Sequence, residues 1–233
     1  MITLTRKREQ KFDLGAWAAC SVLLDYPSEQ LIANLPNIKK LVGDHSGANE
    51  LINFLQETDL QIVQQQYVQT FDLARKSSLY LTYYAYGDTR NRGQALLHFK
   101  QIYRNSGGQW NEETGELPDH LCALLTFGVT VDAEAAYQLM LDHRAGLEML
   151  NIALQTWRNE DDTVGSPWLG AITMLCDTLP ELAGEGVEAL RRLIEQGPPA
   201  EEVGLGGYGI DPAISMASPV LISGSSIQVG APR

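Results

Sequence analysis

Residues 31–42 read LIANLPNIKKLV, and their apolar side chains recur at a helical interval. Leu31, Leu35, Ile38 and Val42 are separated by steps of four, three and four residues, so they share one face of an α-helix. Signals for β-strands and hairpin turns are nearly absent from the rest of the chain. The segment therefore predicts an amphipathic helix within an all-α fold.

The same periodicity extends to both sides of this segment. Leu60, Val63, Tyr67 and Phe71 continue it, and a T-x-x-Q capping box at residues 58–61 is expected to start their helix. Further apolar faces are expected at Leu14, Trp17, Ala18 and Leu24, at Leu96, Phe99 and Tyr103, at Leu147, Leu150, Leu154 and Trp157, and at Val187, Leu190 and Ile194. Helix boundaries are expected at Pro27, Pro36, Pro118, Pro167 and Pro180.

These patterns predict one domain, a bundle of about eight to eleven helices over residues 12–196. Residues 197–233 are rich in glycine and proline and have no periodic apolar face, so a flexible tail is predicted there. The tail contains GLGGYG at residues 204–209, which matches the G-x-G-x-x-G motif of dinucleotide sites. Prolines on both sides exclude the strand and helix that such a site requires.

The charge of the chain restricts its partners. The 233 residues carry a formal net charge of −12. Residues 1–11 carry +3 and residues 198–233 carry −2, so the net charge of residues 12–197 is −13. Phosphate binding requires clustered Lys and Arg, so a nucleic-acid partner is excluded and a cationic partner is favoured. The apolar runs are too short for membrane insertion. Cys20, Cys122 and Cys176 lie far apart, which argues against disulfides and zinc sites.

The N-terminus has some features of a signal peptide, because Arg6, Lys7, Arg8 and Lys11 precede an apolar run over residues 14–24. Asp13 at the start of this run and the D-Y-P sequence that ends it do not fit a signal peptide. The run is therefore predicted to be the first core helix of a cytoplasmic protein.

No residue pattern indicates catalysis or a metal site. His45, His98, His120 and His143 lack a second His or Cys at i+4, and no pair of carboxylates is indicated by spacing. We therefore predict that the chain is not an enzyme and binds no metal.

Two segments are unusually rich in aromatic and charged residues. In the first, Tyr80, Tyr83 and Tyr84 follow helical spacing and are expected on one helix face, with Asp88 as the N-cap of the next helix. This face is either a core seam or the floor of a groove for a partner helix. The second segment reads ELPDHL at residues 116–121 and is typical of a helix start, which leaves His120 unexplained.

The chain resembles the NarJ family over about residues 14–125. The resemblance rests on Tyr67-x-x-x-Phe71-Asp72, on Ser77-Ser78-Leu79, on the segment from Gly87 to Ala95 with its Arg90 and Arg92, and most specifically on Glu116-Leu117-Pro118-Asp119-His120-Leu121. Residues 73–76 depart from the pattern, which expects a further basic residue and a glycine after the Asp.

The resemblance implies an all-helical chaperone for assembly of nitrate reductase. Such a chaperone binds the N-terminal segment of the apo catalytic (alpha) subunit and keeps it competent for insertion of molybdopterin guanine dinucleotide, which the chaperone does not hold stably. Proteins of cofactor biosynthesis are further implied partners, and the protein is expected to be a monomer or weak homodimer. The alternatives are a chaperone for another twin-arginine-exported molybdoenzyme, a nucleotide-dependent switch and a permanent subunit.

The predicted client-peptide site combines residues from both segments. Phe71 and Leu79 are expected to supply apolar affinity, and Asp72 and Asp119 to orient basic client residues. If His120 lies at the contact, affinity should change between about pH 5.5 and 7.5. The arginines are assigned to internal ion pairs first and to client carboxylates second. The full set is Tyr67, Phe71, Asp72, Arg75, Leu79, Tyr83, Arg90, Arg92, Asp119 and His120.

Overall fold

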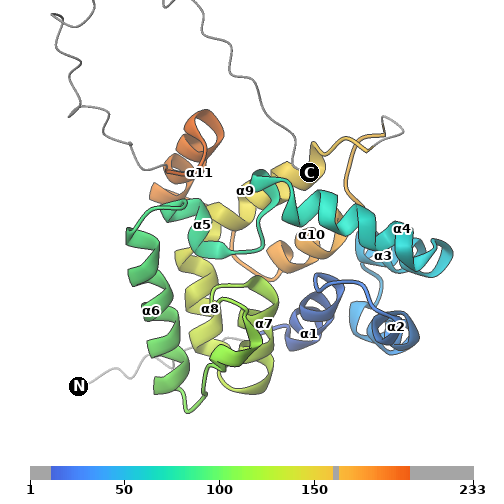
Figure 1. Cartoon of the computed structure of the whole chain (residues 1–233), viewed down its shortest axis with the longest axis horizontal. Coiled ribbons are helices and arrows are strands. Elements are labelled where there is room, and N and C mark those ends of the chain that lie inside the picture. Colours follow the sequence, from blue (N-terminus) through green and yellow to red (C-terminus); the bar gives the residue numbers. More distant parts are fainter. Residues whose placement is uncertain (1–11, 160–162, 200–233) are drawn as a thin grey trace, which may run out of the picture. The chain divides into compact units, whose positions relative to one another are not determined.

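The structure is a computed structural model that describes residues 12–159 and 163–199, all within the unit Met1–Glu201 (Figure 1). Nearly all of the predicted tail, with its glycine motif at residues 204–209, lies outside the described residues. The boundary predicted at residue 196 and the flexibility predicted for the tail therefore stay predictions.

The described residues fold into eleven α-helices and contain no strand, which confirms the predicted all-α class and helix number. A π-helix, η1 (Val68–Asp72), and two 3-10 helices, η2 (Arg75–Ser77) and η3 (Glu112–Thr114), lie between them. The α-helices are α1 (Leu14–Leu23), α2 (Glu29–Val42), α3 (Ser46–Glu57), α4 (Leu60–Tyr67), α5 (Leu81–Tyr86), α6 (Asn91–Asn105), α7 (Leu121–Thr130), α8 (Ala133–Asp142), α9 (Arg144–Gln155), α10 (Leu169–Asp177) and α11 (Glu185–Gln196).

Helix α1 lies at the centre of the fold, where it packs against α2, α7 and α10. It is apolar on nearly every side, as expected for a helix surrounded by others. Trp17, Cys20 and Leu23 are fully buried, and the indole N–H of Trp17 donates to Thr178 Oγ1 at 2.9 Å. The prediction of a first core helix over this run is therefore confirmed, but Leu14, which was expected on its apolar face, is 39% exposed.

The apolar face predicted for residues 31–42 is confirmed, because all four of its spaced residues are buried in the core. Pro36, however, lies inside α2 and not at a helix boundary. It is exposed, so its ring faces away from the core and the helix loses one backbone N–H donor without breaking.

Two other helix predictions are wrong in detail. The residue that caps α4 is Asp59, whose carboxylate accepts from the N–H of Gln61 at 2.8 Å, whereas Thr58 ends α3. On α11 the buried residue is Leu193, while Val187 and Ile194 are 46% and 56% exposed. Spacing alone could not select which of two adjoining apolar faces packs against α9.

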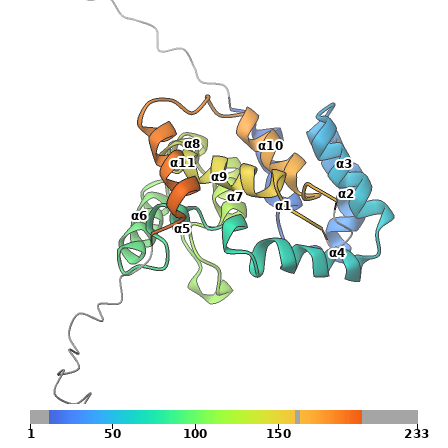
Figure 2. The same cartoon turned by 90° about the horizontal axis from the view of Figure 1, so that it is seen from above.

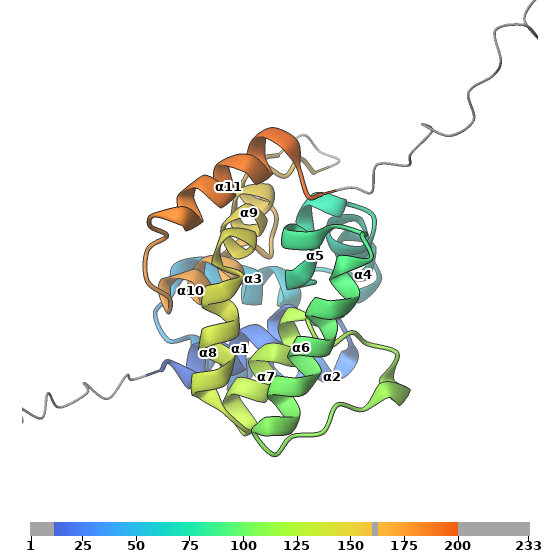
Figure 3. The same cartoon turned by 90° about the vertical axis from the view of Figure 1, so that its left-hand side faces the viewer.

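Figures 2 and 3 show the arrangement of α4 with η1 and of the helices α6 to α8. Figure 2 shows that α4 continues into η1 as one helical segment. Figure 3 shows α6, α7 and α8 side by side. Ring contacts support this arrangement, because Tyr103 of α6 lies 4.4 Å from Phe127 of α7, measured between ring centroids.

Helices α3 and α10 cross at two glycines, and this crossing gives a stability prediction. A Cβ atom on Gly170 would lie 2.0 Å from the carbonyl carbon and oxygen of Gly47, so the two backbones would have to separate. We expect Gly170→Ala to lower the free energy of unfolding by about 1–3 kcal/mol, measured by urea denaturation. Gly93→Ala is the matched control, because its Cβ would meet nothing within 4 Å and helix propensity should raise stability by about 0.5–1 kcal/mol. Equal effects of the two substitutions would contradict this account.

Candidate functional site

The two segments of the family motif meet in an antiparallel β-bridge. The N–H of Leu81 donates to the carbonyl of Asp119 at 3.1 Å, and the N–H of Leu121 donates to the carbonyl of Leu79 at 2.8 Å. This pairing places the rings of Tyr80 and His120 edge to face, with centroids 5.1 Å apart. Residues distant in sequence are thus fixed side by side.

Asp119 holds this bridge together from inside the protein. Its side chain is fully buried, and its Oδ2 atom accepts hydrogen bonds from the N–H of Thr82 at 3.1 Å and from the Thr82 hydroxyl at 2.5 Å. Arg92 Nη2 lies 3.6 Å from the same oxygen, and Arg92 Nε donates to Thr82 Oγ1 at 3.1 Å. The predicted contact between Asp119 and basic client residues does not fit this burial.

Arg92 links the bridge to α6 and to two aromatic rings. Its Nη1 atom lies 3.6 Å from Asp88, and its guanidinium lies over the rings of Tyr80 and Tyr83 at 5.5 and 5.9 Å from their centroids. The internal ion pair preferred for Arg92 is therefore confirmed. Asp88 is not the N-cap of α6, because Arg90 occupies that position and its side chain makes no capping bond.

The predicted tyrosine face on one helix is also wrong. Tyr80 precedes α5 and its ring contacts His120. Tyr84 is buried deeper, and its hydroxyl donates to the carbonyl of Ser78 at 2.9 Å. The helix begins at Leu81 because the bridge between Tyr80 and His120 holds Tyr80 in an extended conformation.

A cavity of about 210 Å³ opens in front of the bridge, and we call it the motif cavity. Its apolar side consists of Tyr67, Phe71 and Leu79, which are largely buried and belong to the core. The Tyr67 and Phe71 rings lie 4.9 Å apart, measured between centroids, with Trp168 packed behind both. The complete lining is Asp25, Tyr26, Tyr67, Phe71, Asp72, Leu79, Tyr80, Glu116 and His120.

The rim of the motif cavity is acidic. Asp25 and Asp72 are exposed and Glu116 is half-buried, while no Lys or Arg occurs among the described residues that line the cavity. Burial, together with a hydrogen bond to the Glu116 carboxylate, raises the pKa of Tyr80, which therefore stays protonated. Three carboxylates around an apolar floor favour a ligand that is both apolar and cationic.

The structure brings together half of the predicted site residues. Tyr67, Phe71, Asp72, Leu79 and His120 line the motif cavity. The other predicted residues lie elsewhere. Arg92, Asp119 and the ring of Tyr83 form the wall behind the bridge, and neither Arg75 in η2 nor Arg90 before α6 lines the cavity.

Four cavity residues are absent from the predicted set: Asp25, Tyr26, Tyr80 and Glu116. Tyr80 and Glu116 lie within the two motif segments and could have been inferred from them. Asp25 and Tyr26 follow α1, where the sequence indicates only a helix end. No local pattern connects them to Tyr67, so their contribution depends on the tertiary fold.

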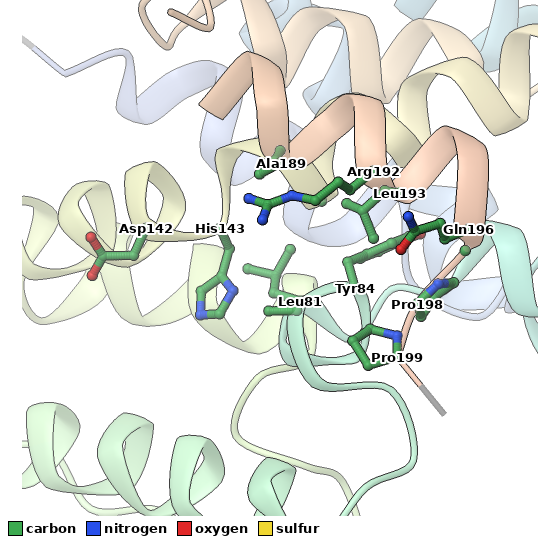
Figure 4. A pocket seen from close by; sticks show the side chains of 14 residues that line it. Leu81, Tyr84, Asp142, His143, Ala189, Arg192, Leu193, Gln196, Pro198 and Pro199 are labelled. Carbon is green, nitrogen blue, oxygen red and sulfur yellow. The ribbon is translucent and has the colours of Figure 1, made fainter. Parts of the chain in front are cut away.

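A larger cavity, of about 640 Å³, lies between α5, α9 and α11 (Figure 4). Tyr84 and Leu193 line it, and its charged side chains, Asp142 and Arg192, have opposite signs. Apart from residues of α5, it contains nothing from the two motif segments. Size alone would favour this cavity, but the motif cavity concentrates the family-specific residues and a single sign of charge.

Comparison with known proteins places the chain in a family. The family model for the nitrate reductase delta subunit matches residues 43–174, which is more than half of the chain. The chain belongs to this family. The match includes both motif segments and confirms the resemblance to NarJ proteins.

Relatives of known name match part of the chain. The nitrate reductase-like protein NarX of Mycobacterium tuberculosis is 37% identical over 142 residues, which are 59% of this chain and 21% of that protein. The probable nitrate reductase molybdenum cofactor assembly chaperone NarJ of Bacillus subtilis is 36% identical over 126 residues, covering 52% and 67%. NarJ of Escherichia coli is 31% identical over 145 residues, covering 58% and 60%. The chain thus spans about a fifth of the mycobacterial relative.

A solved structure supports the fold alone. A putative redox enzyme maturation protein from Archaeoglobus fulgidus superposes with a TM-score of 0.50 at 17% sequence identity, covering 82% of this chain and 99% of that one. Within residues 12–159 and 163–199, no cluster of three or more His, Cys, Asp or Glu is placed to hold a metal ion. None of the described helices combines the length and apolarity that a membrane span requires.

Proposed function

We propose that the protein is an assembly chaperone of nitrate reductase that binds the N-terminal segment of the apo catalytic subunit in the motif cavity. The observation that carries this proposal is an apolar floor rimmed by three carboxylates and built from the family's motif residues. The NarJ relatives are named as molybdenum cofactor assembly chaperones, which supports the same function. The protein catalyses no reaction, and the cofactor is inserted into the client.

In this mechanism the cavity residues have distinct roles. Apolar client side chains contact Phe71, Leu79 and Tyr67, while Asp25 and Asp72 attract basic client residues. The buried Asp119, Thr82 and Arg92 fix the wall, so they position the cavity and do not touch the client. Binding holds the apo-enzyme in the cytoplasm until the cofactor is inserted, and a reversible affinity then allows release.

His120 makes client binding dependent on pH. Burial lowers the pKa of His120 below its ordinary 6.5, although the carboxylates of Glu116, Asp25, Asp119 and Asp72 oppose this shift. His120 is therefore neutral at pH 7, and its protonation at lower pH adds a positive charge that competes with a basic client. The sequence predicted that affinity changes around an ordinary histidine pKa. The lowered pKa of His120 moves this expected change to lower pH.

We expect affinity for the client peptide to stay constant from about pH 8 to 6.5 and to fall below that range. Stability should fall in the same direction, because the unfolded chain, with the higher His120 pKa, binds more protons there. Isothermal titration calorimetry at several pH values tests this. His120→Gln should flatten the affinity profile even though buried His143, whose pKa burial also lowers, is still present. An unchanged profile in this variant would exclude His120 from the mechanism.

Titration with a synthetic peptide copying the N-terminal segment of the nitrate reductase catalytic subunit tests the function itself. We expect binding that is micromolar or tighter and that weakens as salt is added, because screening reduces the attraction of the exposed carboxylates. A peptide with its Lys and Arg residues replaced by Glu should not bind. Binding of a leader peptide from another molybdoenzyme, without binding of this one, would assign a different client.

A further inference from the structure

A second cavity, of about 470 Å³, adjoins the motif cavity, and we call it the Trp110 cavity. Asp25, Glu116 and His120 line both cavities, so these three residues form the ridge that separates them. The two cavities are therefore neighbours on either side of an acidic ridge, and we call them together the groove. The Trp110 cavity lies on the side of α1 and α7, away from Phe71.

The floor of the Trp110 cavity is aromatic. The ring of Tyr103 lies 4.4 Å from that of Phe127 and 5.9 Å from that of Trp110, measured between centroids. The Tyr103 hydroxyl donates to the carbonyl of Pro118 at 2.6 Å, which ties this floor to the motif turn. Trp110 is half-buried and Val131 is 47% exposed, so apolar surface remains available to a ligand.

The charges of the Trp110 cavity have the same sign as those of the motif cavity. Asp25 and Glu116 are its only charged residues at neutral pH, and no Lys or Arg occurs among the described residues that line it. Along the groove, the surface therefore changes from apolar at Phe71 to acidic at the ridge and back to apolar at Trp110. A complementary ligand presents an apolar side chain, a basic side chain and a second apolar side chain along one face.

We propose that the Trp110 cavity is a second subsite for the same client segment, which it engages through an apolar side chain on the far side of a basic residue. An amphipathic helix presents such side chains at i, i+3 or i+4 and i+7, which matches a two-part groove. The inference rests on the proposed function, and it specifies the segment: an apolar anchor on each side of a Lys or Arg that faces Asp25 and Glu116. A segment with one apolar anchor fills only half of the groove.

Peptide titration of substituted proteins tests the second subsite. The probe is the N-terminal peptide of the nitrate reductase catalytic subunit, with a fluorophore for anisotropy. We expect Trp110→Ala and Val131→Arg each to weaken binding by about tenfold or more, because Trp110→Ala removes an aromatic contact and Val131→Arg places a cation in the acidic groove. Leu97→Arg is the matched control: Leu97 is 58% exposed on α6, lines neither cavity and gives the same change of charge.

Peptide variants then assign the contact to a side chain. Replacing the apolar residue beyond the basic residue by Ser should weaken binding to the wild type but have little further effect in Trp110→Ala. A different outcome would contradict the second subsite but leave the proposed function intact. In that outcome the peptide binds the wild type, Asp72→Asn weakens its binding, and neither Trp110→Ala nor Val131→Arg changes its affinity. If the folded wild type binds no peptide, the second subsite and the proposed function are both overturned. An equal loss of affinity in Leu97→Arg and Val131→Arg would show that net charge causes the effect, and this result would overturn the second subsite.

Discussion

Asp119→Ala should lower the free energy of unfolding by about 3–5 kcal/mol, because it removes one partner from a buried charged network. Arg92, with a largely buried side chain, would lose its buried counter-ion, and the Thr82 N–H and hydroxyl would lose their acceptor. The bridge between residues 79–81 and 119–121 would lose its internal support. Urea denaturation followed by circular dichroism measures the effect directly.

Two comparisons make this prediction specific. Asp72→Ala removes an exposed carboxylate from the same motif and should change stability by less than about 0.5 kcal/mol. Replacing Asp119 and Arg92 together by leucine should cost less than the sum of the two single substitutions, because no unpaired charge then stays buried. A loss below about 1 kcal/mol in Asp119→Ala would show that the network does not hold the site wall.

Reversing the charge of the rim should have the largest effect on binding. We expect Asp25→Arg combined with Asp72→Arg to weaken binding of the basic client peptide by about a hundredfold, or about 2.7 kcal/mol, because attraction becomes repulsion at two positions of the rim. Both residues are exposed, so the fold should tolerate the change. Most of the loss should appear as slower association at low salt, measured by stopped-flow anisotropy.

The control for this pair is Asp44→Arg combined with Glu57→Arg. Both residues are exposed and line neither the motif cavity nor the Trp110 cavity, and the substitutions change the net charge by the same amount. Its binding should decrease only slightly through the general field of an acidic protein. If the two double variants lose affinity equally, the rim carboxylates do not form a specific site.

The fold was predictable from sequence where a single helix face is apolar. The buried face of α2 follows from the spacing of Leu31, Leu35, Ile38 and Val42 alone. On α11 the prediction failed, because apolar residues lie on two faces and only the packing of α9 selects Leu193. Pro36 was misplaced because a proline on an exposed helix surface costs one hydrogen bond and need not end the helix.

The site was predictable in part, because the family motif identifies both of its segments but not what each residue does. Phe71 and His120 line the cavity, whereas Asp119 and Arg92 are partners of each other within the wall. Spacing along a chain cannot pair residues that the tertiary fold brings together. For the same reason no sequence pattern indicates that Asp25, which follows α1, completes the acidic rim.

The motif contains residues that hold the wall and residues that line the cavity, and these two roles explain its composition. Its polar residues are used to hold an extended bridge at a fixed position, and the bridge places Tyr80 and His120 beside an apolar floor. The acidic rim then selects basic clients through exposed side chains that need no precise geometry. Substitutions in the wall should therefore act on stability, and substitutions on the rim should act on association.

Whether the acidic rim binds the client can be measured by isothermal titration calorimetry with the N-terminal peptide of the nitrate reductase catalytic subunit. The two proteins to compare are the wild type and the variant carrying Asp25→Arg and Asp72→Arg. We expect a single site in the wild type, with micromolar or tighter affinity, and about a hundredfold weaker binding in the folded variant. Absence of binding by the folded wild type, or equal affinity in the two proteins, would show that the rim carboxylates do not bind the client.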